Sequence, residues 1–259
     1  MMYKIVFFDV DGTLTDPIGG SIPLNTQHTI RALITSGIQV VAATGRPLSM
    51  CNELISLGIQ TFITANGAYA KHKETVIHKN VVSPTIIKDV CDYAKNHHSG
   101  LLFFTEGLSM NEIKNERIQT ALYETLLLKD YPEHDPMIHE KDVYLMCLYE
   151  DQTGSKHFEE RFPELTFSRW HPTICNVLQE EVDKSIAIEK VLSHFGLEAS
   201  QAIAFGDGSN DIEMIKTVGT GIAMGNANEQ LKSIADFVTK SSIEDGITFA
   251  LHKYNVLPV

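Results

Sequence analysis

The first third of the chain alternates between continuous apolar runs and segments whose apolar residues recur every three or four positions. Three such runs, which predict strands buried on both faces of a sheet, lie at 4–8, 38–44 and 61–65. Between them, the periodicity predicts a helix over 25–36, capped by Asn25, and a second helix over 47–58. This order predicts an α/β fold with a Rossmann-like, doubly wound parallel sheet.

After residue 65 the pattern changes to that of a second α+β unit. A hairpin is expected at 65–82, followed by a helix that Ser83 and Pro84 open and that ends near 97. Further strands are expected at 101–106, 143–150, 165–170 and 174–179, and further helices at 112–130 and 153–161.

The first pattern resumes near residue 184. Helices are expected at 184–195 and 243–252, and strands at 201–207 and 220–225. The sequence therefore predicts a core in two pieces, 1–81 and 183–259, with an inserted α+β cap over 82–182. Its tethers, near 80–83 and 179–183, are the expected hinges, with Glu180 and Glu181 marking an exposed link.

Composition narrows the function classes. The formal net charge is −12, which disfavours nucleic acid as a partner because phosphate backbones need Lys and Arg. A bound metal ion would still admit small anionic substrates. No apolar run approaches the length of a membrane span, and the N-terminus lacks the pattern of a signal peptide, so we expect a cytoplasmic protein. None of the four cysteines forms a CxxC pair, and we expect buried, reduced thiols.

Polar residues gather where the predicted core strands end. Ligand sites of open parallel sheets lie beyond the carboxyl ends of their strands. The residues placed there, or at the start of a core helix, are Asp9, Asp11, Gly12, Thr13, Thr44, Gly45, Arg46, Asn66, Gly67, Lys184, Gly206, Asp207, Asn210 and Asp211.

The chemistry of this set points to phosphoryl transfer. Several carboxylates in one place repel one another unless a cation joins them, and hard oxygen ligands without Cys or His select Mg²⁺. Thr44 and Lys184 suit phosphate oxygens, and the glycines let backbone N–H groups approach an anion. Of two acids at i and i+2, Asp9 and Asp11, one could attack phosphorus while the other moves protons.

Each element alone has a simpler interpretation. Asp9 and Asp11 could belong to a solvated turn, Thr44 could cap a helix, and Lys184 could lie on the surface. Asp207 and Asp211 could stabilise a turn, since Asp is a turn former. Their joint occurrence, each after a buried strand or opening a core helix, favours a site.

These residues also carry a resemblance. "DVDGTL", "TGR", Lys184 and "GDGSND" resemble the four motifs of the haloacid dehalogenase (HAD) superfamily, and the insert resembles the type 2 cap of Cof-type phosphatases (subclass IIB). The segment "WHPTICNV" at 170–177 resembles a stretch of hexose-phosphate phosphatases in this group. Two positions depart from the pattern: Ser185 replaces a frequent glycine after the lysine, and Gly208 and Ser209 replace a frequent asparagine or other residue.

The resemblance implies a role for each matching residue. Asp9 is the nucleophile and Asp11 the general acid/base. The residues implied to bind Mg²⁺ are Asp9, the backbone carbonyl of Asp11, Asp207 and, through waters, Asp211. Those implied to hold phosphate are Thr44, Gly45, Lys184 and Asn210, with Thr13 helping to set the first loop. The candidates for contact with the substrate or the cap are Arg46, Asn66, Gly67, His171 and Asn176.

The expected activity is Mg²⁺-dependent hydrolysis of a small phosphorylated metabolite, with sugar phosphates favoured over nucleotides, flavin mononucleotide or pyridoxal phosphate. A phosphomutase of the same superfamily is the nearest alternative. A receiver domain would be about half as long, a nicotinamide-binding domain would need G-x-G-x-x-G after the first strand, and a non-catalytic binding protein would not need every motif residue. A monomer is expected, without nucleic acid or membrane partners.

Overall fold

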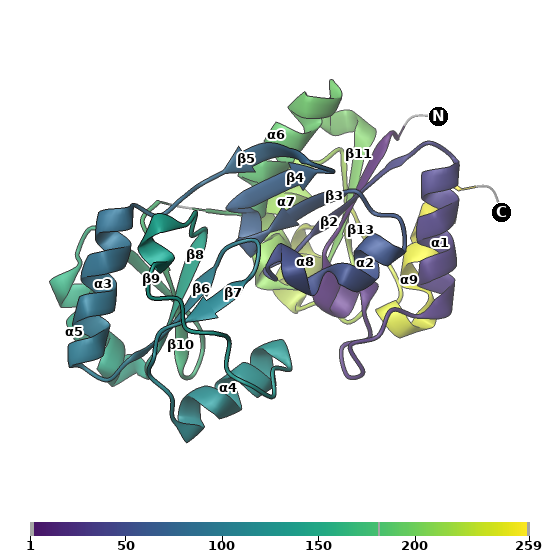
Figure 1. Ribbon diagram of the computed structural model, residues 1–259. Helices are drawn as coiled ribbons and strands as arrows, with labels where there is room; N and C mark the ends of the chain where they lie inside the picture. The colour runs from purple at the N-terminus through teal and green to yellow at the C-terminus, as the bar shows by residue number, and fades with distance from the viewer. Residues whose placement is uncertain (1–2, 181, 258–259) are drawn as a thin grey trace. The chain divides into compact units, whose positions relative to one another are not determined.

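The computed structural model describes residues 3–180 and 182–257, so the expected hinge residue Glu181 lies outside the described residues. The chain divides into two compact units. The core unit comprises Met1–Lys79 and Asp183–Val259, and the inserted unit comprises Asn80–Val182. Each is a separate α/β body with its own sheet (Figure 1).

The sheet of the core unit has eight strands within the described residues, in the order β13-β12-β11-β1-β2-β3-β4-β5. Its strands are β1 (Ile5–Phe8), β2 (Gln39–Ala43), β3 (Thr61–Thr64), β4 (Tyr69–His72), β5 (Thr75–Lys79), β11 (Ala202–Gly206), β12 (Thr220–Ala223) and β13 (Phe237–Val238). The strands from β13 to β3 pair in parallel, whereas β4 and β5 are antiparallel. The predicted α/β fold with a parallel core is confirmed.

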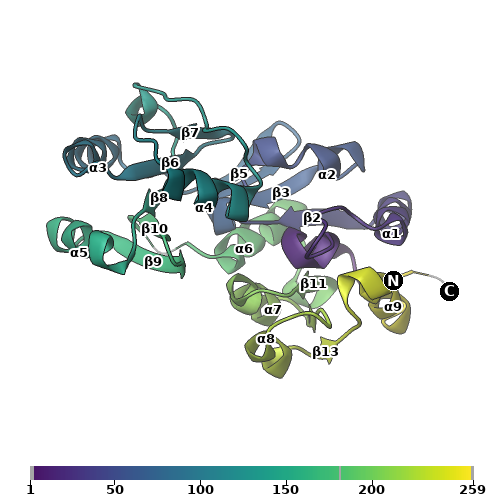
Figure 2. The ribbon, with the colours of Figure 1, turned by 90° about the horizontal axis from the view of Figure 1, so that it is seen from below.

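Helices cover both faces of this sheet (Figure 2). They are α1 (Leu24–Thr35), α2 (Asn52–Ser56), α6 (Lys184–Phe195), α7 (Ile212–Thr217), α8 (Glu229–Ile234) and α9 (Gly246–Lys253). Helices α1, α2 and α9 contribute Leu33, Leu54 and Leu251 to one apolar cluster, and α6 and α7 contribute Ile188 and Ile215 to the other. This two-sided burial explains why the strands read as continuous apolar runs.

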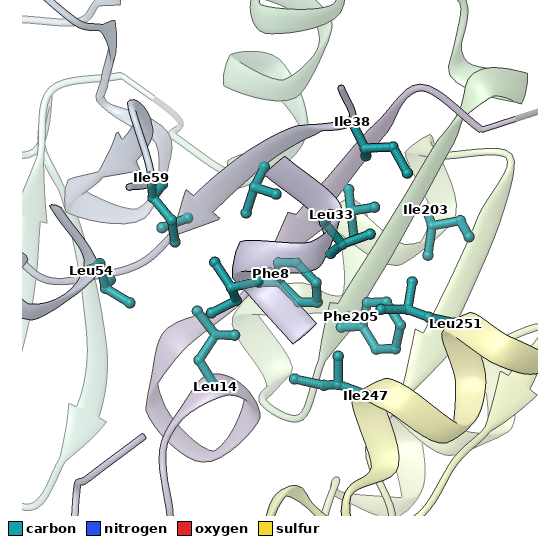
Figure 3. Close-up of a cluster of buried hydrophobic side chains, with 14 of the residues drawn as sticks. Phe8, Leu14, Leu33, Ile38, Leu54, Ile59, Ile203, Phe205, Ile247 and Leu251 are labelled. Carbon is teal, nitrogen blue, oxygen red and sulfur yellow. The ribbon is translucent and has the colours of Figure 1, made fainter. Parts of the chain in front are cut away.

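Two buried phenylalanines pack against each other just before the acidic residues that follow β1 and β11. Phe8 and Phe205 stand opposite each other in β1 and β11, with ring centroids 5.1 Å apart and planes at 21°, inside the cluster of Figure 3. Burying a phenylalanine side chain contributes about 1.5–3 kcal/mol. Asp9 directly follows Phe8, and Asp207 lies two residues after Phe205, so this apolar pair fixes the strands from which both carboxylates emerge.

The inserted unit has an antiparallel sheet of five strands, counted over its described residues, in the order β7-β6-β8-β10-β9. The strands are β6 (Gly100–Phe104), β7 (Leu108–Met110), β8 (Leu145–Tyr149), β9 (Thr166–His171) and β10 (Ile174–Leu178), and the helices are α3 (Pro84–Asn96), α4 (Glu116–Leu126) and α5 (Gln152–Arg161). Val90 of α3 and Phe158 of α5 pack with Phe103 in one apolar cluster.

Several local expectations were wrong. Pro23, not Asn25, occupies the N-cap of α1, so the helix begins one residue earlier than expected. The helix expected over 47–58 is a short 3-10 turn at Leu48–Met50 and then α2, because the backbone of Cys51 leaves the helical region between them. The helix expected over 112–130 spans only Glu116–Leu126, because the next residue, Leu127, adopts a left-handed backbone conformation.

Three of the four cysteines are buried, as expected. Cys51, Cys147 and Cys175 are buried free thiols, while Cys91 is half-buried. Among the described helices, none combines the length and the apolar character that a membrane crossing requires.

Candidate active site

Three carboxylates meet at the carboxyl edge of the core sheet. Asp9 follows β1 and stands at the N-cap of a tight turn, Val10–Leu14, while Asp207 and Asp211 follow β11. Each offers one oxygen, and these oxygens lie within 4.8 Å of one another, so Asp9, Asp207 and Asp211 could hold a metal ion. The parallel pairing of β1 with β11 brings together acids that are about 200 residues apart in the sequence.

Lys184 is a buried cation between two of these acids. It is the first residue of α6, whose N-cap, Asp183, accepts from the N–H groups of Ser185 (2.6 Å) and Ile186 (3.3 Å). Its Nζ lies 2.6 Å from Oδ1 of Asp9 and 2.6 Å from Oδ1 of Asp211. Burial alone would lower the pKa of Lys184, but the two carboxylates outweigh burial and raise it, so the lysine stays charged.

The acids carry more negative charge than one lysine balances. Burial, and then repulsion from Asp211, raises the pKa of Asp9 well above its ordinary value despite the attraction of Lys184. The same two causes raise the pKa of Asp207 to about 6. An additional cation would relieve this repulsion and favour the ionised forms of both groups.

Both carboxylate oxygens of Asp211 accept hydrogen bonds from neighbouring groups. Its Oδ1 contacts Lys184, while its Oδ2 accepts from the backbone N–H groups of Asp207 (3.0 Å) and Gly208 (2.9 Å). The side chain is fully buried. A Cβ at Gly206 would lie 2.6 Å from that of Asp211, so the strand needs a glycine there. Asp211 thus shapes the loop that presents Asp207.

Asp11 differs sharply from Asp9. The Asp11 side chain is 58% exposed and that of Asp9 only 7%. Arg46 pairs with both oxygens of Asp11, Nε donating to Oδ2 at 3.0 Å and Nη2 to Oδ1. Between Asp11 and Thr13 the chain turns at Gly12 with φ +87°, and a Cβ there would lie 2.3 Å from Oδ2 of Asp207. Glycine therefore lets the first loop approach Asp207 closely.

The remaining motif residues frame this edge. Thr44 follows β2, is buried, and accepts from the N–H of Arg46 at 3.1 Å. Asn66 accepts at Oδ1 from Nδ2 of Asn210 at 3.2 Å, and a Cβ at Gly45 would lie 3.1 Å from the same oxygen. Gly67 has φ +106°, and a Cβ there would lie 2.1 Å from the carbonyl oxygen of Asp183. A glycine at this position therefore lets the loop after β3 pack closely against the start of α6.

His171 and Asn176 lie in the inserted unit. Nε2 of His171 lies 3.4 Å from Oε2 of Glu124, and its Nδ1 lies 3.1 Å from Oγ1 of Thr173. His171, Glu124 and Thr173 line a hollow of about 460 Å³, and Arg117 also lines it. Asn176 has another environment, because its Oδ1 accepts from Nε1 of Trp170 at 2.9 Å.

Sequence reasoning missed Asn226. This residue lies in the loop after β12, where Nδ2 donates to the carbonyl of Gly12 (2.8 Å) and approaches Oδ2 of Asp207 (3.4 Å). The available signal was its place after a further buried core strand, in "GNA" at 225–227. An uncharged residue in a turn is too common to single out on that basis.

Comparison with known proteins agrees with this geometry. The family model for haloacid dehalogenase-like hydrolases matches residues 6–251. The chain therefore belongs to the haloacid dehalogenase-like hydrolase family, as its four motifs indicate.

Three proteins, two of them known from solved structures, are similar to this chain over nearly its whole length. YkrA of Bacillus subtilis (strain 168), named provisionally as a phosphatase, is 36% identical and covers 98% of each chain. A Geobacillus kaustophilus protein of hypothetical function is 34% identical, with a TM-score of 0.91 over 98% of this chain and 100% of that one. The subclass IIB sugar phosphatase BT4131 is 30% identical, with a TM-score of 0.80 over 98% and 100%. These findings make the protein a phosphatase of this superfamily.

Proposed function

We propose that the protein hydrolyses small phosphate monoesters, chiefly sugar phosphates, in two steps through an aspartyl-phosphate on Asp9. The observation that carries this proposal is the difference between the two acids of the first loop. Asp9 is buried against Lys184, as a fixed nucleophile requires, whereas Asp11 is largely exposed, as a group that exchanges protons with a leaving alcohol and with water requires.

In the first step, an oxygen of Asp9 attacks phosphorus while the bond from phosphorus to the ester oxygen breaks. Asp11 gives its proton to the departing alkoxide. In the second step, Asp11 takes a proton from water, whose oxygen attacks the phosphorus of the aspartyl-phosphate and frees Asp9 and inorganic phosphate. Arg46, which contacts both oxygens of Asp11, holds this carboxyl group at the site.

The donor set fits Mg²⁺. Asp9 and Asp207 offer hard carboxylate oxygens with raised pKa values, and no Cys or His belongs to the described acidic group. The residues proposed to hold the ion are Asp9, the backbone carbonyl of Asp11 and Asp207, with Asp211 acting through waters. When bound, the ion would offset the negative charge of both the carboxylates and the phosphate.

The remaining charge stabilisation comes from the chain itself. We assign phosphate oxygens to Lys184, to the hydroxyl of Thr44, and to the backbone of Gly45, with Asn210 orienting the group from the opposite loop. Donors that are fixed before substrate arrives are effective because they need no reorganisation during the reaction. Asn210 is held in this way by its contact with Asn66.

Substrate specificity is assigned to the inserted unit, and catalysis to the core unit. The hollow beside His171 is lined by carboxylate, guanidinium, imidazole and hydroxyl groups, which suit the hydroxyls of a polyol. A Bacillus subtilis relative, 29% identical over 97% of this chain, is named a phosphatase of 5-amino-6-(5-phospho-D-ribitylamino)uracil. That compound and a sugar phosphate both carry phosphate on a hydroxylated carbon chain.

The proposal includes the cellular setting and motion of the protein. We expect a cytoplasmic monomer that opens at its tethers, near 80–83 and 179–183, to admit substrate. Protection of these tethers from proteolysis by substrate with Mg²⁺ would support that motion, and unchanged cleavage would contradict it.

A phosphate-release screen tests the function. The purified chain is assayed with Mg²⁺ against hexose phosphates, ribitylaminouracil phosphate, nucleotides, flavin mononucleotide and pyridoxal phosphate, with Asp9→Asn as the control. Release from the polyol phosphates is expected to exceed the rest. Formation of an isomeric sugar phosphate without free phosphate would indicate a phosphomutase, and no Mg²⁺-dependent turnover would indicate a binding protein.

A further inference from the structure

Asn226 connects three segments that are far apart in the sequence. Its Nδ2 donates to the carbonyl of Gly12 in the first loop at 2.8 Å and lies 3.4 Å from Oδ2 of Asp207 in the loop after β11. Its Oδ1 accepts at 3.1 Å from the N–H of Ser242, the first residue of a 3-10 turn. Both ends of this one amide are therefore occupied, and its orientation is determined.

Neutral donors contact both oxygens of Asp207. Thr13 donates from Oγ1 to Oδ1 at 3.1 Å, and Asn226 faces Oδ2 from the other side. Lys184 makes its contacts with the other two acids, Asp9 and Asp211. Thr13 and Asn226, together with the neighbouring Asp9, thus orient the Asp207 carboxylate.

We propose that Asn226 is a positioning residue for the metal-binding oxygens. Asn226 contacts the Gly12 carbonyl and the Asp207 carboxylate at once. It thereby sets the distance between the backbone oxygens of the first loop and the side chain of Asp207. This inference rests on the proposed Mg²⁺-dependent function. Outer partners that orient metal ligands typically contribute a factor of about 10–100 in affinity or activity.

An amide is required in this place. The Gly12 carbonyl and the Asp207 carboxylate are both acceptors and need a donor, whereas the Ser242 N–H needs an acceptor. Asparagine supplies an NH₂ group and an oxygen on one short side chain, and aspartate would set an oxygen against two others. A residue that had no influence on these oxygens would leave the affinity of the folded protein for Mg²⁺ unchanged.

The test is a Mg²⁺ titration of Asn226→Ala by calorimetry, in the absence of substrate. We expect the dissociation constant to rise by roughly 10–100-fold, and excess Mg²⁺ to restore much of kcat/KM. The matched control is Asn111→Ala in the inserted unit, which also loses contacts to two backbone groups, the carbonyl of Ser99 (2.9 Å) and the N–H of Leu101 (3.0 Å). Its Mg²⁺ affinity should equal that of the wild type.

A second variant reaches the same amide without changing it. Ser242→Pro removes the N–H that Oδ1 of Asn226 accepts, and proline suits this first position of a turn because Ser241 has φ −66° and ψ 165°. Weaker Mg²⁺ binding, by less than in Asn226→Ala, is expected. A folded Asn226→Ala or Ser242→Pro protein with wild-type affinity overturns the inference. A wild-type chain that binds no Mg²⁺ overturns the proposed function and this inference together.

Discussion

Nζ of Lys184 lies 2.6 Å from Oδ1 of Asp9, and the two side chains are 0% and 7% exposed. A buried ion pair of this kind is maintained because each charge offsets part of the desolvation cost of the other. The contact also determines where the Asp9 carboxylate lies before any substrate arrives. A nucleophile held in position in this way loses less entropy on reaching its transition state.

Removing the lysine should therefore destabilise the fold. Lys184→Met leaves Asp9 and Asp211 buried without their cation, and the free energy of unfolding should fall by about 3–5 kcal/mol. Added Mg²⁺ should recover part of that loss by neutralising the same carboxylates. Urea unfolding with and without MgCl₂ measures both effects. Lys190→Met, at an exposed position of the same helix, is the control, and an equal loss there would contradict the assignment.

Asp9→Asn should abolish catalysis and spare the fold. The amide is nearly isosteric with the carboxylate but cannot attack phosphorus, so kcat should fall by roughly 10⁴–10⁶. Far-UV circular dichroism and the unfolding midpoint test whether the chain remains native. Ordinary phosphatase activity in this variant would remove Asp9 from the nucleophile role.

Asp11→Asn should make the rate depend on the leaving group. Loss of the proton donor should slow alkyl phosphates by about 10²–10⁴, and p-nitrophenyl phosphate, which leaves without a proton, much less in the first step. A burst of p-nitrophenol followed by slow turnover is expected, because water activation also fails. Steady turnover at the wild-type rate would refute the acid/base role.

The raised pKa of Asp207 predicts a direction for metal binding and stability. Its pKa of about 6 in the folded protein lies above the ordinary value of 3.8, so the folded state retains the proton longer than the unfolded chain. Without Mg²⁺, this group stabilises the fold below pH 3.8, and that contribution is lost as the pH rises to 6. Conversely, Mg²⁺ affinity should weaken as the pH falls through 6, because protons compete for the carboxylate.

Calorimetric Mg²⁺ titrations and thermal unfolding between pH 4.5 and 7.5 measure these two effects. Asp207→Asn supplies the comparison, since its unfolding profile should lose the part that this carboxyl contributes. Mg²⁺ affinity that stays constant through pH 6 would contradict the environment described for Asp207.

Gly12→Ala should weaken Mg²⁺ binding through a steric effect. The new Cβ would lie 2.3 Å from Oδ2 of Asp207 and would displace that carboxylate. Gly37→Ala is a close control, because Gly37 also has a left-handed φ, +78°, but has no atom within 4 Å of its Cβ position. Both variants share the backbone strain of about 1 kcal/mol, so equal Mg²⁺ affinities would show that the contact with Asp207 is unimportant.

Much of the core could be predicted from the sequence because burial on both faces leaves a strong signal. The strands around Val6, Val41 and Ile203 are continuous apolar runs, and their order alone indicates where their carboxyl ends meet. The ends of elements leave a weaker signal in the sequence. Cys51 interrupts a helical pattern, and β7 has only three residues, too few for an alternation to be recognised.

The acidic residues of the site could be predicted from the sequence, but the cation that contacts each of them could not. That Lys184 is shared by Asp9 and Asp211, while Arg46 holds Asp11, depends on side-chain positions created by packing between distant segments. Asn226 illustrates the same limit, because its partners Gly12 and Ser242 come close only in the folded sheet.

The two ends of the inserted unit are joined to each other. Asn80 donates from Nδ2 to Glu180 at 3.3 Å, and the N–H of Ser83 donates to Oε1 of Gln179 at 2.8 Å. The two connections between the core and the inserted unit therefore lie next to each other. For the core, the whole insert is equivalent to one short loop between neighbouring chain ends. Changes of sequence within the insert, including changes that suit a new ligand, would therefore leave the connections of the catalytic sheet unaltered.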